Sequence, residues 1–389
     1  MAKTILQEKL SKIDKLANAI NNKAGKNIIS RLSNEETKEK LKIKFIPTPS
    51  KNINDTIGGG FPRKRTTIVT GKEDSGKTSL LLQSIGYNMS IDPEFVACWL
   101  ESESSLELNY LIDTFHIDPE RFVYLEHERE GAGEAALEKI ESILALSVCD
   151  MVVINSLKCL VPSAEMERSI AQETIALQAR MNAKMARKFT SLVSESNAAF
   201  VIVQHLTTDI GSMAHDKSVL AGGGAIRYAS ALTIDLRKRS LAPTDPITPE
   251  EGIKIGLTVK KNHCTPAINP YLKTEYYVVF GEGIEQYLET LENAIEQGIL
   301  YKGGAYIKDL DPDTGEVRQY NGQDLVWRGK ESYRQFMKDN PEYFETLMNR
   351  VAGTYIEMTA EEIREAKLSE KDLVEDNEAE TNFTLETTE

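Results

Sequence analysis

The octapeptide GKEDSGKT at residues 71–78 constrains the fold of this chain more than any other feature. It matches the pattern GxxxxGK[ST], follows the apolar segment TTIVT and opens the helical run SLLLQSIGY. A strand, a glycine loop and a helix in this order bind phosphate, because the glycines let backbone N–H groups curl round it and the helix N-terminus adds its positive dipole end. We expect Lys77 to reach the β- and γ-phosphates of ATP and the Thr78 hydroxyl to ligate Mg²⁺. The candidate nucleotide-contacting residues of this segment are Gly71, Lys72, Glu73, Asp74, Ser75, Gly76, Lys77, Thr78 and Ser79.

The fold class predicted around this loop is α/β with a mostly parallel central sheet. From about residue 60 to 285, short apolar segments alternate with helical ones, which is typical of a parallel sheet covered by helices. The expected strands are 66–70, 95–100, 151–155, 200–204, 231–237, 253–259 and 276–280.

Four parts are expected along the chain. Residues 1–45 form an amphipathic helix and a loose polar arm, and residues 46–285 form the α/β core. Residues 286–356, with helical segments around a Tyr/Gly-rich patch, predict a small α+β lobe. Residues 357–389 are predicted to form an acidic disordered tail.

The acidic tail decides how the net charge is interpreted. The formal charge of the chain is −14, but the tail alone holds twelve acidic and three basic residues, a net of −9. Such a run is usually a solvated terminus. The alternative is an electrostatic competitor for DNA that folds back onto basic surface, so the overall charge does not exclude a nucleic-acid partner.

Composition excludes several other classes. No apolar run approaches the roughly 20 residues that a membrane helix requires, and the N-terminus lacks the apolar block of a secretion signal, so we expect a cytoplasmic protein. The four cysteines are far apart in sequence and form no CxxC, and the histidines form no ligand cluster. Neither a disulfide framework nor a zinc site is predicted.

Beyond the phosphate loop, a series of motifs resembles the RecA recombinase family, including its phage members. In the family's order, at about its spacing, come GKNIISRL, LESE, MVVINS, VPSAEMERS, GGGAIRYAS, VKKNH, FGEGI, GGAYIKDLD and FMKDNPE. The resemblance implies a RecA-type P-loop ATPase core with an N-terminal polymerisation arm and a small C-terminal lobe. It also implies an ATP- and Mg²⁺-dependent DNA-stimulated ATPase, which forms a helical filament on single-stranded DNA and promotes pairing and strand exchange with duplex DNA in repair.

A glutamate after the strand at 95–100 is the candidate general base. An exposed carboxylate at a strand end can hold a water near the γ-phosphate and accept its proton. Spacing leaves Glu101, Glu103 and Glu107 as equal candidates, and the resemblance selects Glu103. It likewise implies that Tyr110 stacks on the adenine.

Two further strand ends contribute polar residues to the same site. In the family, the strand MVVINS ends in an Asp of the magnesium shell; here it ends in Asn155, which can orient a metal-bound water but lacks the charge, so weaker Mg²⁺ binding or slow turnover is expected. After FVIVQ, His205 matches the γ-phosphate sensor in the form found in UvsX-like phage members. A neutral imidazole can donate a hydrogen bond to a phosphate oxygen.

Two loops are expected to face DNA. Residues 206–224 lack helical or strand periodicity, and the resemblance makes them the second DNA-binding loop. It also implies that the apolar tip Ile175 intercalates in the first loop, while Arg180 and Arg187, two turns apart on one helix face, contact DNA phosphates. The candidate DNA-contacting residues of the second loop are Gly222, Gly223, Gly224, Ile226 and Arg227.

The resemblance also implies a site completed by a neighbouring copy of the chain. Lys261 matches a lysine that reaches across to the neighbour's ATP, and His263 stands where the family has a second one. Phe280 and Gly281 resemble the segment that touches a nucleotide from the same side. A head-to-tail contact that does not close gives a helical filament.

Two other functions remain open at the level of sequence. A RecA-core DNA motor or remodelling ATPase would share the phosphate loop and Glu103. An ATP-binding, DNA-coating filament with little hydrolysis would be consistent with the changes at Asn155 and His263.

Overall fold

The computed structural model describes residues 4–25, 27–127, 132–167, 177–208, 218–220, 224–243, 245–265 and 272–353. The chain forms two compact units, Met1–Gln286 and Tyr287–Glu389. None of the helices in the described ranges combines the length and the apolar character that a bilayer span requires.

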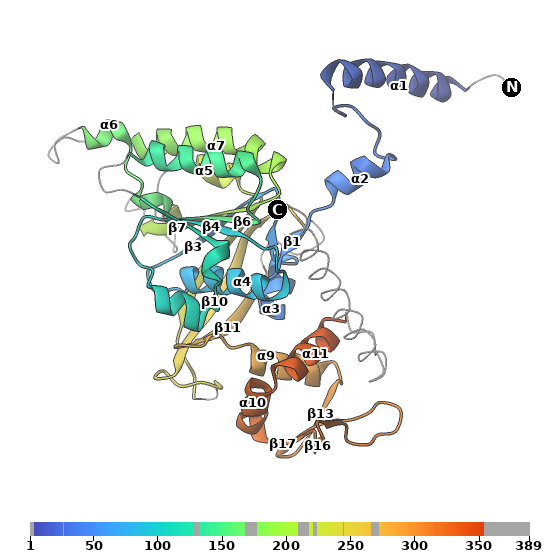
Figure 1. The fold of residues 1–389 in the computed structure, drawn as a ribbon, viewed down its shortest axis with the longest axis vertical. Helices are drawn as coiled ribbons and strands as arrows, with labels where there is room; N and C mark the ends of the chain where they lie inside the picture. The colour runs from blue at the N-terminus through green and yellow to red at the C-terminus, as the bar shows by residue number, and fades with distance from the viewer. Residues whose placement is uncertain are drawn as a thin grey trace, which may run out of the picture. The chain divides into compact units, whose positions relative to one another are not determined.

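The larger unit is built on a ten-stranded sheet with the order β12-β11-β10-β9-β3-β7-β6-β4-β5, and β8 pairs with β7 (Figure 1). Pairing is parallel from β9 through β5 and antiparallel among β9, β10, β11 and β12. This confirms the α/β class with a mostly parallel sheet. The strands are β3 Thr66–Gly71, β4 Ala97–Glu101, β5 Phe122–Glu126, β6 Met151–Asn155, β7 Ala199–Thr208, β8 Ser218–Leu220, β9 Leu232–Arg239, β10 Gly252–Asn262, β11 Lys273–Val279 and β12 Gly283–Ile284.

All seven expected strands are present, but the pattern missed the edge strand β5. Its side chains are half-buried or exposed, with no clean alternation between faces, so its periodicity carried little signal. A separate two-stranded sheet joins β1 Phe45–Ile46 to β2 Phe61–Pro62.

Helices cover both faces of the sheet, because successive side chains of a buried strand point to opposite sides. On β3, Val69 belongs to the core cluster under α4 and α3, whereas Ile68 belongs to the cluster under α5 and α7. Figure 1 shows α5 and α7 side by side over one face. The helices of this unit are α1 Ile5–Ala24, α2 Glu35–Leu41, α3 Lys51–Ile57, α4 Lys77–Ile91, α5 Gly133–Leu146, α6 Ser163–Met166, α7 Leu177–Glu195 and α8 Ala225–Ala229.

The N-terminal arm has more internal structure than the loose polar stretch that we expected. The side chain of Asn21, on α1, donates to the carbonyl of Ile29 at 2.8 Å and accepts from the N–H groups of Ile28 and Ile29. Helix α2 begins after the N-cap Asn34, whose side chain accepts from the N–H of Thr37. Capping and Glu/Lys pairs within one helical turn support this short helix in a segment that periodicity leaves undefined.

In its described residues, the smaller unit packs three helices and a three-stranded sheet, with the order β13-β14-β17, around an aromatic core. Trp327 is buried against the edge of Tyr333 at 5.3 Å between ring centroids. Its elements are α9 Gln286–Glu296, β13 Leu300–Gly303, β14 Tyr306–Asp309, β15 Gln319–Tyr320, β16 Gln323–Asp324, β17 Val326–Arg328, α10 Gly329–Asp339 and α11 Pro341–Ala352. The four-part division of the chain stays a prediction.

Candidate nucleotide site

The candidate site lies at the carboxyl ends of four neighbouring parallel strands, β3, β7, β6 and β4. Their register brings Gly71 opposite His205 and Glu101 opposite Asn155. Ligands of open α/β sheets bind at this edge, because the polar strand ends and the following loops meet there.

The phosphate loop is a tight turn in which glycine is required at two positions. A Cβ on Gly71 would lie 2.3 Å from the Ser75 hydroxyl oxygen and 2.6 Å from the carbonyl oxygen of Leu236. Gly76, the N-cap of α4, has φ +78°, and a Cβ there would lie 2.2 Å from Cδ1 of Ile255. The loop therefore leaves its backbone free to surround an anion at the N-terminus of α4.

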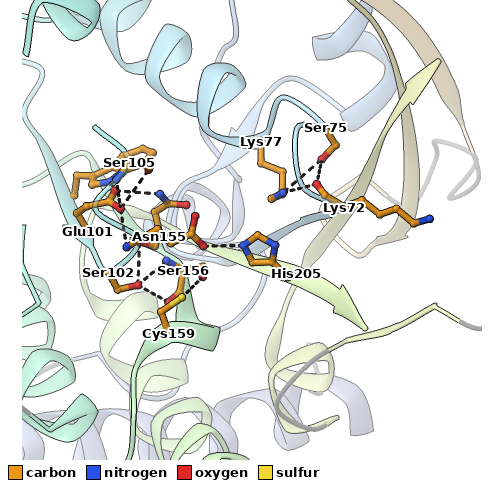
Figure 2. A network of polar contacts seen from close by, with 12 residues as sticks. Lys72, Ser75, Lys77, Glu101, Ser102, Ser105, Asn155, Ser156, Cys159 and His205 are labelled. Carbon is orange, nitrogen blue, oxygen red and sulfur yellow. Dashed lines mark hydrogen bonds and ion pairs between the residues drawn. The ribbon is translucent and has the colours of Figure 1, made fainter. Parts of the chain in front are cut away.

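Lys77 directs its amine into this loop (Figure 2), where it donates to the carbonyl of Lys72 at 2.7 Å. Burial lowers the pKa of the Lys77 amine. The carboxylates of Glu103, Asp74 and Glu73 act in the opposite direction and favour the charged form. This gives the extra carboxylate of Asp74 a physical role, since it helps to keep a buried amine charged.

The structure separates the three candidate glutamates by what each one contacts. Glu101 is buried; one carboxylate oxygen accepts from the Trp99 indole at 2.8 Å and the Asn155 amide at 3.0 Å, and the other from the N–H of Glu103 at 2.8 Å. Glu107 is exposed and accepts from the backbone N–H groups at the start of the next helical turn. The carboxylates of Glu101 and Glu107 therefore accept hydrogen bonds that fix the local backbone, whereas Glu103 faces the site.

Glu103 meets the candidate sensor directly. Its Oε1 atom lies 2.7 Å from Nε2 of His205, and the side chains of Glu103 and His205 are 23% and 22% exposed. Figure 2 labels His205 and draws this contact as a dashed line. Glu103 lies in the segment that follows β4, and His205 lies on β7. A proton acceptor and an imidazole are thus in direct contact at this edge of the site.

Asn155 is fully buried at the end of β6. Its nitrogen donates to Glu101, and its oxygen has no hydrogen-bond partner among the described residues. An unpaired buried acceptor suits a donor such as a metal-bound water. The donor set at this edge, with Thr78 half-buried in the first turn of α4, therefore fits an Mg²⁺ ion held with a nucleotide.

Tyr110 lies on a π-helical turn, Tyr110–Thr114, and is 42% exposed. Its ring packs edge-on against Phe115, with centroids 4.8 Å apart. One side of the ring is thus supported by the core, and the exposed remainder is available for stacking on a base.

The residues expected to act on a neighbouring copy differ in how this chain holds them: Lys261 is hydrogen-bonded within it, and the others are exposed. The amine of Lys261 donates to the carbonyls of Arg227 at 2.9 Å and Tyr228 at 3.2 Å, at the C-terminus of α8. Burial, and then the charge of Arg227, lower the pKa of this amine. His263, Phe280 and Gly281 are exposed. A role of Lys261 at another protomer's nucleotide requires its release from α8.

The candidate DNA residues are described only in part. Arg180 and Arg187 are exposed on α7, and Gly224 and Arg227 are exposed at α8. Ile226 is 2% exposed and packs in the core cluster under α5 and α7, so it anchors α8 here, and its contact with DNA stays a prediction. Three predicted positions, Ile175, Gly222 and Gly223, lie outside the described residues.

The predicted loop at 206–224 contains more regular structure than its composition indicated. Strand β7 continues to Thr208 and forms an antiparallel ladder with β8, in which Leu206 pairs with Leu220. Backbone pairing within a hairpin needs no apolar alternation, so the polar sequence gave no signal for it.

The sequence also did not reveal the contacts that join the ends of β4 and β6. The Ser102 hydroxyl donates to the carbonyl of Ser156 at 2.8 Å and accepts from its N–H at 2.9 Å. With Trp99 and Glu101, these serines fix the strand ends beside Glu103 and Asn155. Figure 2 shows Glu101, Ser102, Asn155 and Ser156 together at these strand ends. A serine directly after each strand, in LES and INS, was the available signal.

Comparison with known protein families decides among the possible P-loop proteins. The family model described as the RecA N-terminal domain matches residues 11–285. The chain belongs to the RecA family. Protein RecA of Citrifermentans bemidjiense is 29% identical over 331 residues, covering 85% of this chain and 90% of the relative. Protein RecA of Thermus aquaticus is 27% identical over 346 residues (89% and 94%), and that of Geobacter sulfurreducens is 29% identical over 349 residues (89% and 94%).

Family membership confirms the resemblance and, with the parallel sheet, the RecA-type fold. RecA proteins are ATP-dependent proteins of recombination and DNA repair, and filament formation is a property of the family. This chain is therefore a protein of ATP-dependent recombination and repair, and neither a motor nor a passive coating protein is favoured.

Proposed function

We propose that this RecA-family chain is a DNA-stimulated ATPase that assembles into a helical filament on single-stranded DNA and pairs it with homologous duplex DNA. The observation that carries the proposal is the meeting of Lys77, Glu103, His205 and Asn155 at one sheet edge, within the part of the chain that the family matches. ATP and Mg²⁺ are the proposed ligands, and the cytoplasm is the proposed compartment.

Each side chain has a specific task in the proposed reaction. The Lys77 amine exchanges the carbonyl of Lys72 for the β- and γ-phosphate oxygens, which are stronger acceptors because they are charged. Glu103 accepts the proton of the attacking water, and His205 orients its carboxylate or donates to the γ-phosphate.

The magnesium ion, held by Thr78 and through water by Asn155, would neutralise charge on the phosphate oxygens. The unpartnered oxygen of Asn155 supports this assignment. The other residues of the phosphate loop supply backbone N–H groups, and Tyr110 stacks on the base.

Coupling to DNA is proposed to run through β7. His205 lies on this strand, which continues to Thr208 and pairs with β8, and the residues after β8 lead to the glycine segment before α8. A change at the γ-phosphate therefore acts on the same backbone that leads into the second DNA-binding loop. Arg180, Arg187 and Arg227 supply positive charge for DNA phosphates.

Assembly is proposed to complete the site in trans. Lys261 leaves the C-terminus of α8 and, with His263, faces the nucleotide of the adjacent protomer, while Phe280 and Gly281 contact the same nucleotide. A donor in trans would stabilise negative charge on the phosphates in the transition state.

The deciding experiment is steady-state ATP hydrolysis with and without single-stranded DNA, with homologous strand pairing measured in parallel. We expect DNA to stimulate hydrolysis and Lys77→Ala to abolish it, because the phosphates lose their buried ammonium partner. The matched control is Lys139→Ala, an exposed position on α5. Intact hydrolysis in the Lys77 variant, or hydrolysis without strand pairing, would contradict the proposal.

A further inference from the structure

The carboxylate of Glu101 accepts several hydrogen bonds at the sheet edge. It is 2% exposed and accepts from the Trp99 indole and the Asn155 amide through Oε2. Oε1 accepts from the N–H of Glu103 at 2.8 Å and, more weakly, from the backbone and hydroxyl of Ser105 at 3.4 and 3.3 Å. Donors thus surround a charge that would otherwise be costly to bury.

This carboxylate fixes which way the Asn155 amide faces. A carboxylate only accepts, so the amide must present its nitrogen to Glu101, 3.0 Å away. The reverse orientation would place two acceptor oxygens against each other. The carboxamide oxygen is therefore turned away from Glu101, and it is the atom left without a partner among the described residues.

A buried acceptor without a donor destabilises a fold unless a ligand or water supplies one. The proposed function puts a hydrated Mg²⁺ ion at this strand end. The same carboxylate also holds the backbone N–H of Glu103, so one buried side chain sets the geometry of both the proposed metal contact and the proposed base.

We propose that Glu101 is a positioning residue for the magnesium shell, which holds the Asn155 oxygen outward and makes asparagine the required partner at the end of β6. The inference rests on the proposed function and deepens it. The negative charge that an aspartate at position 155 would supply is present one strand away, at position 101. It follows that Asn155 is matched to Glu101 and is not simply a weakened aspartate.

Because Asn155 lacks the charge of an aspartate, Asn155→Asp would be expected to strengthen Mg²⁺ binding. The role proposed for Glu101 predicts that it weakens Mg²⁺ binding. An aspartate at this position would place a second carboxylate about 3 Å from that of Glu101, where like charges repel in a buried site. In the double variant Glu101→Gln/Asn155→Asp, the new amide nitrogen can donate to the new carboxylate. One negative charge is then restored, although the Trp99 indole, which donates to the same Oε2 atom in the wild-type protein, loses that acceptor.

The test measures binding of a non-hydrolysable ATP analogue as a function of Mg²⁺ concentration, together with the unfolding temperature of the nucleotide-free protein. Removal of outer-shell partners typically changes metal affinity by about 10–100-fold. We expect Glu101→Gln and Asn155→Asp each to raise the Mg²⁺ concentration for half-maximal binding by about tenfold or more. The double variant should recover most of this loss. Glu126→Gln, the same change on an exposed residue in register with Glu101 on β5, is the control and should leave the curve in place.

Glu101→Asp keeps the test decisive if Glu101→Gln does not fold. It retains the charge but cannot span both the Asn155 amide and the Glu103 N–H, so it should raise the Mg²⁺ requirement as well. If the Glu101 variants have a lower unfolding temperature but an unchanged Mg²⁺ dependence, Glu101 has only a structural role and the inference is overturned. Tighter Mg²⁺ binding in Asn155→Asp would overturn it as well. Failure of the wild-type protein to bind the analogue with Mg²⁺ would overturn the proposed function itself.

Discussion

Nε2 of His205 and Oε1 of Glu103 lie 2.7 Å apart, although 102 residues separate them in the sequence. The contact joins β7 to the segment that follows β4, on either side of β6. Because His205 engages the carboxylate that we assign as the base, nucleotide must compete with a contact that already exists inside the protein. The two roles, sensing the γ-phosphate and activating water, are physically linked.

Glu103→Gln should slow hydrolysis by roughly 10²–10⁴, the usual contribution of a general base, while ATP and DNA binding persist. The amide can still pair with His205 but cannot accept a proton. Single-turnover hydrolysis and analogue binding, measured on the same preparation, check this. If Glu107→Gln slows hydrolysis as much and Glu103→Gln does not, the base has been assigned to the wrong glutamate.

Arg180→Ala and Arg187→Ala should weaken single-stranded DNA binding to a similar extent for all sequences, because phosphate contacts carry no base information. Each loss should reduce the slope of log affinity against log salt by about 0.7. The control on the same helix is Lys188→Ala, whose amine already pairs with Glu141 at 2.5 Å. An equal loss in the control would show that α7 contributes only general positive charge.

Deletion of the acidic tail, residues 357–389, should tighten duplex DNA binding, because a tethered anionic segment competes with DNA phosphates for the same Lys and Arg groups. These residues lie outside the described part of the chain, so the prediction rests on charge alone. The gain should shrink as salt lowers the Debye length below about 8–10 Å. A full-length tail with its carboxylates changed to amides is the matched control and should behave like the deletion. Superimposable salt titrations would leave the tail as a solvated terminus.

Asp309→Ala should destabilise the smaller unit by about 3–5 kcal/mol, because it leaves a buried cation without its partner. Asp309 is fully buried and accepts from both terminal nitrogens of Arg350, at 2.5 and 3.1 Å, and from the Tyr343 hydroxyl. Denaturant unfolding of the full chain, followed by tryptophan fluorescence, measures the loss; Trp327 reports on the smaller unit and Trp99 on the larger one. Asp324→Ala removes an exposed carboxylate from the same unit and should change stability by less than about 0.5 kcal/mol.

Features that depend on residues close together in the chain could be predicted from the sequence. The phosphate loop is contiguous: strand, glycines, lysine and helix follow one another, so the pattern at 71–78 predicted the turn that forms. The buried strand β6 was predictable because an apolar run of this length, bounded by polar segments, is typical of a parallel sheet. Strand β5 was missed because an edge strand need not bury its side chains.

The contacts of each polar residue at the sheet edge depend on the folded chain and could not be predicted from local sequence. Glu101, Glu103 and Glu107 were equivalent by spacing, and they differ because strand register puts Asn155 beside the first and His205 beside the second. The burial of Ile226 and the capping of α8 by Lys261 have the same origin. Hydrogen bonds and packing act over a few ångströms, and residues 54 or 102 positions apart come within that range only after the sheet has set the strand order.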